Sequence, residues 1–167
     1  GIIKKGVIMK FNQKIAVITG GSRGLGKNIA LRLAAYGADA IITYHSRKDE
    51  ADAVVSEIET HDQKALALQL NVADTTSFDG FMRQVSNALK DKWGRDKFDF
   101  LINNAGIGAT ATIAQTTEEI FDSLFNVHFK GVYFLTQKAT PLINDNGCVI
   151  NISSGLTRFT LPGYSAY

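Results

Sequence analysis

A run of glycines between residues 19 and 26 is the first feature of the sequence with a chemical use. It reads Thr-Gly-Gly-Ser-Arg-Gly-Leu-Gly and lies between a short apolar stretch and an apolar pattern at helical spacing. Glycines at a strand-to-helix turn let backbone N–H groups and the helix N-terminus approach a pyrophosphate closely. The spacing differs from the generic G-x-G-x-x-G fingerprint, and a bare glycine cluster can also be a strained turn without a ligand. Its place between a strand and a helix favours a phosphate site.

The elements that must position this turn alternate along the chain. Apolar runs predict strands at 15–19, 40–44, 64–70, 98–103 and 148–152, and helical spacing predicts helices over about 25–37, 48–60, 76–92 and 117–139. Strands joined by helices of this length require parallel βαβ units with right-handed crossovers and helices on both faces. The sequence therefore predicts a doubly wound α/β sheet of the Rossmann-like kind, in one domain over 9–167.

Length, composition and charge exclude several classes of protein. The chain has 167 residues, 45% of them hydrophobic, and can bury one core. Residues 1–8 lack a folding pattern and are interpreted as a leader or expression-derived segment. Without Lys4 and Lys5 the basic and acidic residues are equal in number, so no nucleic-acid partner is predicted. No apolar run is long enough for a membrane span or a signal peptide, and we expect a cytoplasmic protein with no membrane partner.

Cys148 is the single cysteine, and it falls in a predicted strand. A lone cysteine excludes an internal disulfide and fits a reducing compartment. We expect it to be a small core residue.

Four features in matching order make the sequence resemble the short-chain dehydrogenase/reductase family from about residue 12 to the end. They are Thr19-Gly20-x-x-x-Gly24-x-Gly26, Asn103-Asn104-Ala105-Gly106, Asn126, and the interval from Ser154 to Tyr167. The resemblance implies a nicotinamide-dependent oxidoreductase with a doubly wound sheet, which transfers hydride between its cofactor and a ketone or secondary alcohol. It also implies a cytosolic homotetramer or homodimer.

The end of the second predicted strand indicates which nicotinamide cofactor binds. NAD-binding sheets carry a carboxylate there that accepts hydrogen bonds from the ribose 2′-hydroxyl. This sequence has Tyr44, His45, Ser46 and Arg47 instead, and in the family Arg23 of the glycine turn faces the same ribose. Such residues favour a 2′-phosphate through charge-assisted hydrogen bonds, so we predict NADP(H) over NAD(H). The alternative is that both arginines are solvated surface charges.

The other cofactor contacts follow from the resemblance. Asn71 and Val72 stand where the family usually has an aspartate that accepts the adenine amino group, a bond that an amide oxygen can also accept. Small residues after the fourth strand would lie against the cofactor's ribose, or would only tie neighbouring strands together. The predicted cofactor-binding residues are Gly20, Ser22, Arg23, Gly24, Leu25, Gly26, Tyr44, His45, Ser46, Arg47, Asn71, Val72, Asn103, Ala105 and Gly106.

Three polar residues are the candidates for catalysis. Carbonyl reduction by hydride needs an acid that protonates the developing alkoxide and a donor that holds the oxygen. By resemblance Tyr167 is the acid, Ser154 is the donor, and the backbone of Asn126 holds a water of the proton relay. A free phenol has a pKa of about 10, which the family lowers with a lysine one helical turn later. That position lies past the last residue given, so we expect a longer natural chain, and little turnover from a protein ending at Tyr167.

Other interpretations remain open at this stage. Taken singly, strand-end serines and loop tyrosines are more often structural. The three histidines show no ligand spacing, so no metal site is predicted. The aromatic residues between 121 and 134 recur at helical spacing and are interpreted as core or subunit interface. Leu156, Phe159 and Leu161 suggest a partly apolar pocket wall.

The substrate class is the least determined feature. A ketone, including a 3-oxoacyl thioester, is the leading prediction. The alternatives are a sugar or alcohol dehydrogenase of the same family, or a non-catalytic NADP-binding sensor.

Overall fold

The computed structural model describes residues 10–158 and 161–167. The predicted leader over 1–8 and the predicted pocket residue Phe159 lie outside these ranges. The strands are β1 (Ile15–Ile18), β2 (Asp39–Tyr44), β3 (Ala65–Gln69), β4 (Phe98–Asn103) and β5 (Ile143–Asn151). The α-helices are α1 (Gly24–Ala35), α2 (Lys48–Glu59), α3 (Phe78–Ala88), α4 (Glu118–Phe125) and α5 (Gly131–Ala139).

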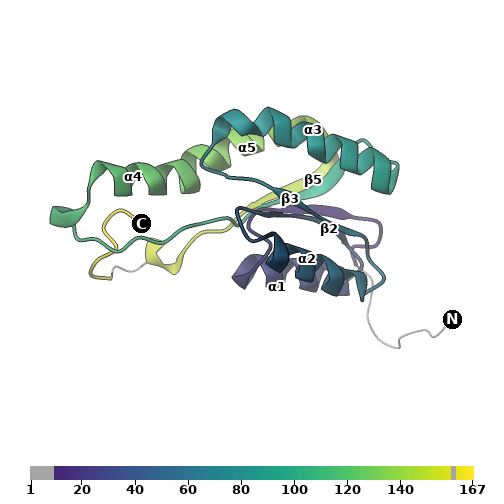
Figure 1. Cartoon of the computed structure of the whole chain (residues 1–167), viewed down its shortest axis with the longest axis horizontal. Coiled ribbons are helices and arrows are strands. Elements are labelled where there is room, and N and C mark those ends of the chain that lie inside the picture. The colour runs from purple at the N-terminus through teal and green to yellow at the C-terminus, as the bar shows by residue number, and fades with distance from the viewer. Residues whose placement is uncertain (1–9, 159–160) are drawn as a thin grey trace.

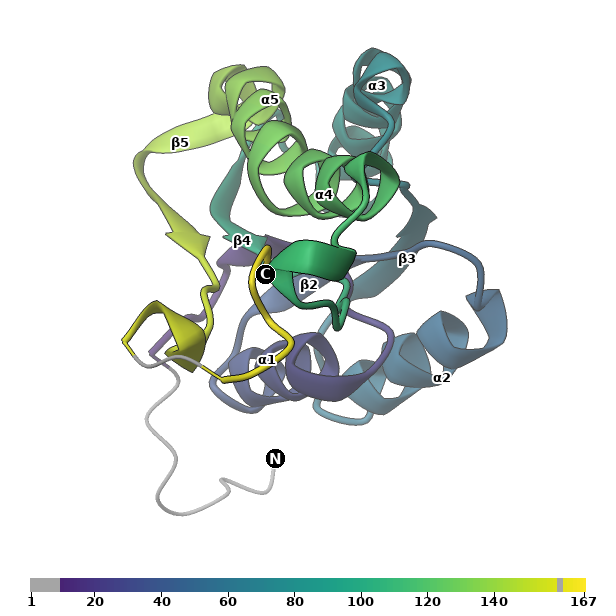
Figure 2. The ribbon, with the colours of Figure 1, turned by 90° about the vertical axis from the view of Figure 1, so that its left-hand side faces the viewer.

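The strands form one five-stranded sheet in the order β3-β2-β1-β4-β5, and all neighbours are parallel. Helices α1 and α2 cover one face, and α3, α4 and α5 lie on the other (Figure 1, Figure 2). The strand order changes direction at β1, so that β2 lies on one side of it and β4 on the other. Open α/β sheets bind their ligands at such a switch point, outside the carboxyl ends of the strands. The predicted doubly wound, Rossmann-like fold is confirmed.

The core explains the apolar runs of the sequence. All four residues of β1 are fully buried, because this central strand has helices on both faces. On the face of α3 and α5, Phe78, Phe81 and Leu135 pack against the sheet. The other face buries the alanines of α1, whose small side chains allow the helix to lie close to the sheet.

The predicted helix over 117–139 consists of two α-helices joined by a π-helical turn over Asn126–Lys130. The turn closes with a bond from the N–H of Gly131 to the carbonyl of Asn126. A Cβ at Gly131 would collide with the carbonyl of Val72, so glycine permits a close approach between this helix and the loop after β3. Helical spacing does not reveal an inserted residue, because apolar positions on both sides keep a similar period.

Cys148 is exposed, which contradicts its predicted place in the core. It pairs with Phe100 on the face of the sheet that carries α1. Strand β5 is the edge strand of the described sheet, and α1 contacts β1 and β2 instead. β5 also begins earlier than predicted, at Ile143. The prediction missed its first part because the polar stretch Asn144–Asn146 breaks the apolar pattern. The pairing of this part with β4 has an irregular register.

Candidate active site and cofactor cleft

The glycine turn after β1 is tied to the end of β2. The N–H of Gly20 donates to Thr43 Oγ1 at 3.1 Å, and the N–H of Gly21 donates to the Thr43 carbonyl at 2.9 Å. Gly20 has φ +63°, in the left-handed region that favours glycine. Arg23 precedes α1 and its side chain makes no capping bond to the first turn. The N-terminus of α1 therefore keeps unsatisfied N–H groups, as an anion site requires.

The same turn is tied to the loop after β4 across the switch point. The side-chain amide of Asn104 donates to the carbonyls of Thr19 and Gly20 at 3.0 and 3.1 Å. In return, Thr19 Oγ1 accepts from the N–H groups of Asn104 and Ala105, both at 2.9 Å. A Cβ at Gly26 would collide with the Gly20 carbonyl and the Asn104 amide, so only glycine fits there. These contacts hold the backbone in a shape that a dinucleotide can approach.

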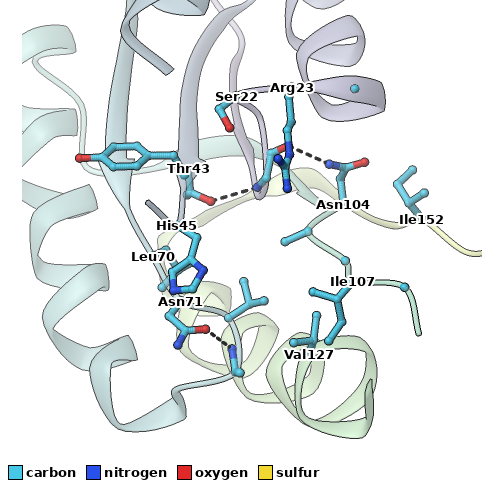
Figure 3. Close-up of a pocket in the computed structure, with 18 of the residues that line it drawn as sticks. Ser22, Arg23, Thr43, His45, Leu70, Asn71, Asn104, Ile107, Val127 and Ile152 are labelled. Carbon is cyan, nitrogen blue, oxygen red and sulfur yellow. Dashed lines mark hydrogen bonds between the residues drawn. The ribbon is translucent and has the colours of Figure 1, made fainter. Parts of the chain in front are cut away.

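A cavity of about 1140 Å³ lies between these elements and the loops that follow the strands. Figure 3 shows Ser22, Thr43 and His45 on one side and Ile107 and Ile152 on the other. The predicted residues that line it are Gly20, Ser22, Arg23, Gly24, Leu25, Tyr44, His45, Ser46, Arg47, Asn71, Val72, Ala105, Gly106, Asn126, Ser154 and Tyr167.

Two predicted cofactor residues do not line the cavity. Gly26 lies behind the turn, in the contact described above. Asn103 is 4% exposed, and its side-chain amide donates to Thr136 Oγ1 at 3.1 Å and to Asn151 Oδ1 at 2.8 Å. Asn103 thus joins β4 to β5 and α5, whereas the adjacent Asn104 lines the cavity.

Arg47 lines the cavity but is engaged by acids of its own helix. Its Nε and Nη2 donate to the two carboxylate oxygens of Asp49 at 3.0 and 2.8 Å, and Nη1 lies 3.2 Å from Glu50 Oε1. The bonds from Arg47 lower the pKa of Asp49 to about 2, and the same pair raises the pKa of Arg47. Glu50 also lines the cavity, which the sequence pattern did not indicate.

Asn71 lies at the adenine end of the predicted site. Its Oδ1 accepts the N–H of Ala73 at 3.0 Å, a bond drawn in Figure 3. An amide oxygen has two lone pairs, so Asn71 retains one for a ligand donor.

Ser154, Tyr167 and Asn126 all line the cavity. Ser154 Oγ accepts the N–H of Leu156 at 3.2 Å, which leaves its hydroxyl hydrogen available to donate. The C-terminal segment is fixed to the loop after β4: the N–H of Ala111 donates to the Gly163 carbonyl at 2.6 Å, and Ser165 Oγ donates to the Ala111 carbonyl at 2.9 Å. This pairing brings the phenol of Tyr167 to the cavity.

His128 is a site residue that the sequence interpretation missed. Its Nε2 lies 2.6 Å from the Ile107 carbonyl, and its ring centroid lies 5.5 Å from that of Tyr167. A Cβ at Gly106 would lie 2.8 Å from the His128 ring, so the loop after β4 packs directly on this side chain. The sequence contains one indication that His128 could belong to the site: it lies two residues after Asn126 in a predicted helix.

Within residues 10–158 and 161–167, no helix is long and apolar enough to cross a membrane. In the same ranges, no three histidine, cysteine or acidic side chains gather in a group that could hold a metal ion.

The chain belongs to the short chain dehydrogenase family, because the model of that family matches residues 14–167. Curated relatives include the 3-oxoacyl-[acyl-carrier-protein] reductase FabG of Staphylococcus aureus, 35% identical over 156 residues, with 92% of this chain and 61% of the relative covered. An uncharacterised oxidoreductase of Methylorubrum extorquens is 37% identical over 158 residues, covering 95% of this chain and 61% of the relative. The chain thus spans about three fifths of the length of these relatives.

Solved structures agree with this assignment. The ketoreductase LanV, solved with bound NADP and rabelomycin, is similar with a TM-score of 0.90 at 33% identity, covering 94% of this chain and 64% of LanV. A short chain dehydrogenase of Burkholderia cenocepacia in complex with NADP gives 0.83 at 35% identity, covering 94% and 62%.

Proposed function

We propose that the natural protein reduces a ketone with hydride from NADPH, or runs the reverse oxidation with NADP. The observation that carries the proposal is one cavity that contains both the glycine turn after β1 and the pair Ser154 and Tyr167. A phosphate-binding turn alone would be consistent with binding of any nucleotide. A serine and a tyrosine alone could be ordinary loop residues without a catalytic role. Their meeting in one cavity supports hydride transfer next to a proton donor.

The chain's own residues fit the nicotinamide cofactor. Gly20 and Gly24 line the cavity and keep the turn free of side chains where the pyrophosphate would approach. Gly26 lets the turn pack closely on Asn104, and the uncapped N-terminus of α1 supplies N–H donors. The loop from Asn104 to Gly106 would lie along the ribose and nicotinamide. When bound, the cofactor supplies or accepts the hydride.

The catalytic steps assigned to the protein concern one substrate oxygen. Ser154 would hold the carbonyl oxygen with its hydroxyl hydrogen, and the Tyr167 phenol would donate its proton to that oxygen as charge develops there. Asn126, at the start of the π-helical turn, would belong to the relay that returns a proton to Tyr167. In the oxidative direction the same phenol would accept the proton from the alcohol.

NADP(H) is the proposed cofactor because the end of β2 lacks the carboxylate that would accept a ribose 2′-hydroxyl. Tyr44 ends β2, and His45, Ser46 and Arg47 follow it along the cavity, with Arg23 in the facing turn. Two similar structures contain NADP. Titration of the natural protein with NADPH and NADH tests this point; equal affinity for both would contradict it.

The proposed substrate is a ketone with an apolar part. Ile107, Val127 and Ile152 form an apolar region of the cavity, and the relatives include a ketoreductase and a 3-oxoacyl reductase. A panel of keto-esters with NADPH, compared with glucose and secondary alcohols with NADP, separates the candidates. Faster keto-ester reduction supports the proposal, whereas faster sugar oxidation favours a dehydrogenase. Binding of NADPH without turnover of any substrate favours a sensor.

Self-association through α4 and α5 is also proposed. Phe121 and Phe125 of α4 and Phe129 of the π-helical turn stack in a row, and Phe129 is 63% exposed. Tyr133 follows four residues after Phe129 and is 61% exposed. We name these four residues the aromatic ridge. Exposing a row of aromatic side chains of this size to water is unfavourable. In a dimer with two-fold symmetry, the aromatic ridge of a second copy would pack against this one and exclude water from both.

A further inference from the structure

Two acids contact all three nitrogens of the Arg47 guanidinium. All three of its nitrogens lie within 3.2 Å of a carboxylate oxygen, two of them on Asp49 and one on Glu50. Both acids belong to the first turn of α2, where a negative charge is also stabilised by the helix dipole. The arginine that should meet a 2′-phosphate therefore already has an anionic partner in bidentate geometry.

The surroundings of the acids make this competition relevant to the cofactor. Arg47 and Glu50 both line the cavity, beside His45 and Ser46 at the end of β2. Glu50 Oε2 is buried and has no hydrogen-bond partner among the described residues. A phosphate that is to bind the Nε and Nη2 edge of Arg47 would thus have to displace the Asp49 carboxylate, and it would be repelled by the nearby Glu50 carboxylate.

We propose that Asp49 is a specificity-determining residue, which competes with the cofactor's 2′-phosphate for Arg47 and so weakens the preference for NADPH over NADH. This inference rests on the proposed function. Asp49 is the stronger competitor because it holds two of the three guanidinium nitrogens, whereas Glu50 holds one. NADH carries no phosphate at this position, so its affinity does not depend on displacing Asp49.

The size of the effect follows from the exposure of the pair. The side chains of Arg47 and Asp49 are 57% and 69% exposed, and exposed ion pairs are weak. Removing the competing charge is expected to tighten NADPH binding by about threefold to tenfold at low salt, and by less at high salt, because salt screens both the ion pair and the repulsion.

The test is the dissociation constant of each cofactor, measured by calorimetry, for the wild-type protein and for Asp49→Asn. The matched control is Asp52→Asn, which removes the same charge from the same helix. Neither Asp49 nor Asp52 lines the cavity, but Asp52 pairs with Lys48 at 2.6 Å, whereas Asp49 pairs with Arg47. Asp49→Asn should tighten NADPH about fivefold and leave NADH within about twofold, while Asp52→Asn should change both by less than about twofold.

The contrary outcomes are distinct. If Asp49→Asn weakens NADPH binding, Asp49 holds Arg47 in place for the phosphate rather than competing for it, and the inference is wrong. Equal changes for both cofactors, or for both variants, would show a general charge effect and would also overturn it. If wild type binds neither cofactor, the proposed function itself fails along with the inference. Tight NADPH binding that Asp49→Asn does not alter removes the inference alone.

Discussion

The ring of His128 lies edge-on against the ring of Tyr167, with centroids 5.5 Å apart and planes at 80°. The same imidazole has its Nε2 2.6 Å from the carbonyl of Ile107. One side chain from the π-helical turn therefore contacts both the loop after β4 and the proposed acid. Because that loop would border the nicotinamide, His128 can fix the distance between the cofactor and the phenol.

Replacement of His128 by leucine should lower kcat about tenfold, because a misplaced reacting group is costly even when binding is retained. His128→Gln keeps a donor that can reach the Ile107 carbonyl and should recover much of this loss. Steady-state kinetics together with NADPH titration checks the prediction. The positioning role is wrong if the leucine and glutamine variants are equally impaired, or if NADPH affinity falls as much as kcat.

Gly26 is the most tightly confined position of the glycine turn. A methyl group at Gly26 would collide with backbone and with Asn104, so Gly26→Ala should destabilise the protein by about 2 kcal/mol and abolish measurable NADPH binding. Gly80 in α3 is the control, because the nearest atom to an added Cβ is the flexible end of Arg83 at 3.7 Å. Gly80→Ala should be neutral or stabilising by up to about 1 kcal/mol. Urea denaturation of both variants measures this; an unaffected Gly26→Ala would contradict the proposed geometry.

The sequence predicted most of the fold because the β1 turn, the parallel strands and their helices each have a local signal. The apolar run at Ile15–Ile18 and the glycine stop after α1 are examples, and both elements lie where they were predicted. The exposure of Cys148 was not predictable, because a strand pattern does not say whether the strand is central or at an edge. Neither His128 nor Glu50 was identified, since each reaches the cavity only through tertiary packing.

The pair Asn103 and Asn104 shows the limit most clearly. The run of small and amide residues was recognised as a site, but β4 ends at Asn103 and Asn104 begins the loop, so the two side chains point in different directions. Asn103 turns into the sheet and α5, and Asn104 turns toward the glycine turn. Which of the two faces the cofactor depends on the register of β4, which the sequence alone does not define.

Asp99 should make folding stability depend on acidity. Its carboxylate is 3% exposed, and this burial by itself would raise its pKa. Hydrogen bonds from the N–H of Ile15, from Asn144 and from Lys14 outweigh the burial, so the pKa is lowered in the folded chain. The stabilisation is therefore complete above the unfolded pKa of about 4 and is lost as the pH falls through the lower folded value.

Asp99→Asn is the corresponding variant. It should lose about 2 kcal/mol of unfolding free energy at neutral pH, because an amide nitrogen would replace a carboxylate oxygen that accepts from the N–H of Ile15 or from Asn144. The difference from wild type should shrink as the pH falls below about 4, because the unfolded chain binds a proton there first and the folded carboxyl is protonated only at its lower pKa. Denaturation curves at several pH values test this. A difference that stays constant with pH would show that ionisation of Asp99 plays no part.

The aromatic ridge should control self-association. Phe129→Glu introduces a charge at the middle of the ridge and is expected to shift the protein toward a smaller species in sedimentation velocity. Ile113 lies in the short 3-10 helix Ile113–Gln115, away from the ridge residues in sequence, and is 86% exposed, so Ile113→Glu is a control for adding a charge at an exposed apolar position. An unchanged sedimentation coefficient for Phe129→Glu would exclude the ridge as the contact surface.

The central claim is that the cavity brings a hydride donor and the Tyr167 phenol to one carbonyl group. Its most direct test is to incubate the natural protein with a keto-ester and with NADPH deuterated at the transferable position, and to locate the label by mass spectrometry. We predict deuterium on the carbinol carbon of the product, and a loss of at least about a hundredfold in rate for Tyr167→Phe with NADPH binding retained. Tight NADPH binding without label transfer to any ketone, or a Tyr167→Phe variant as fast as wild type, would contradict the account.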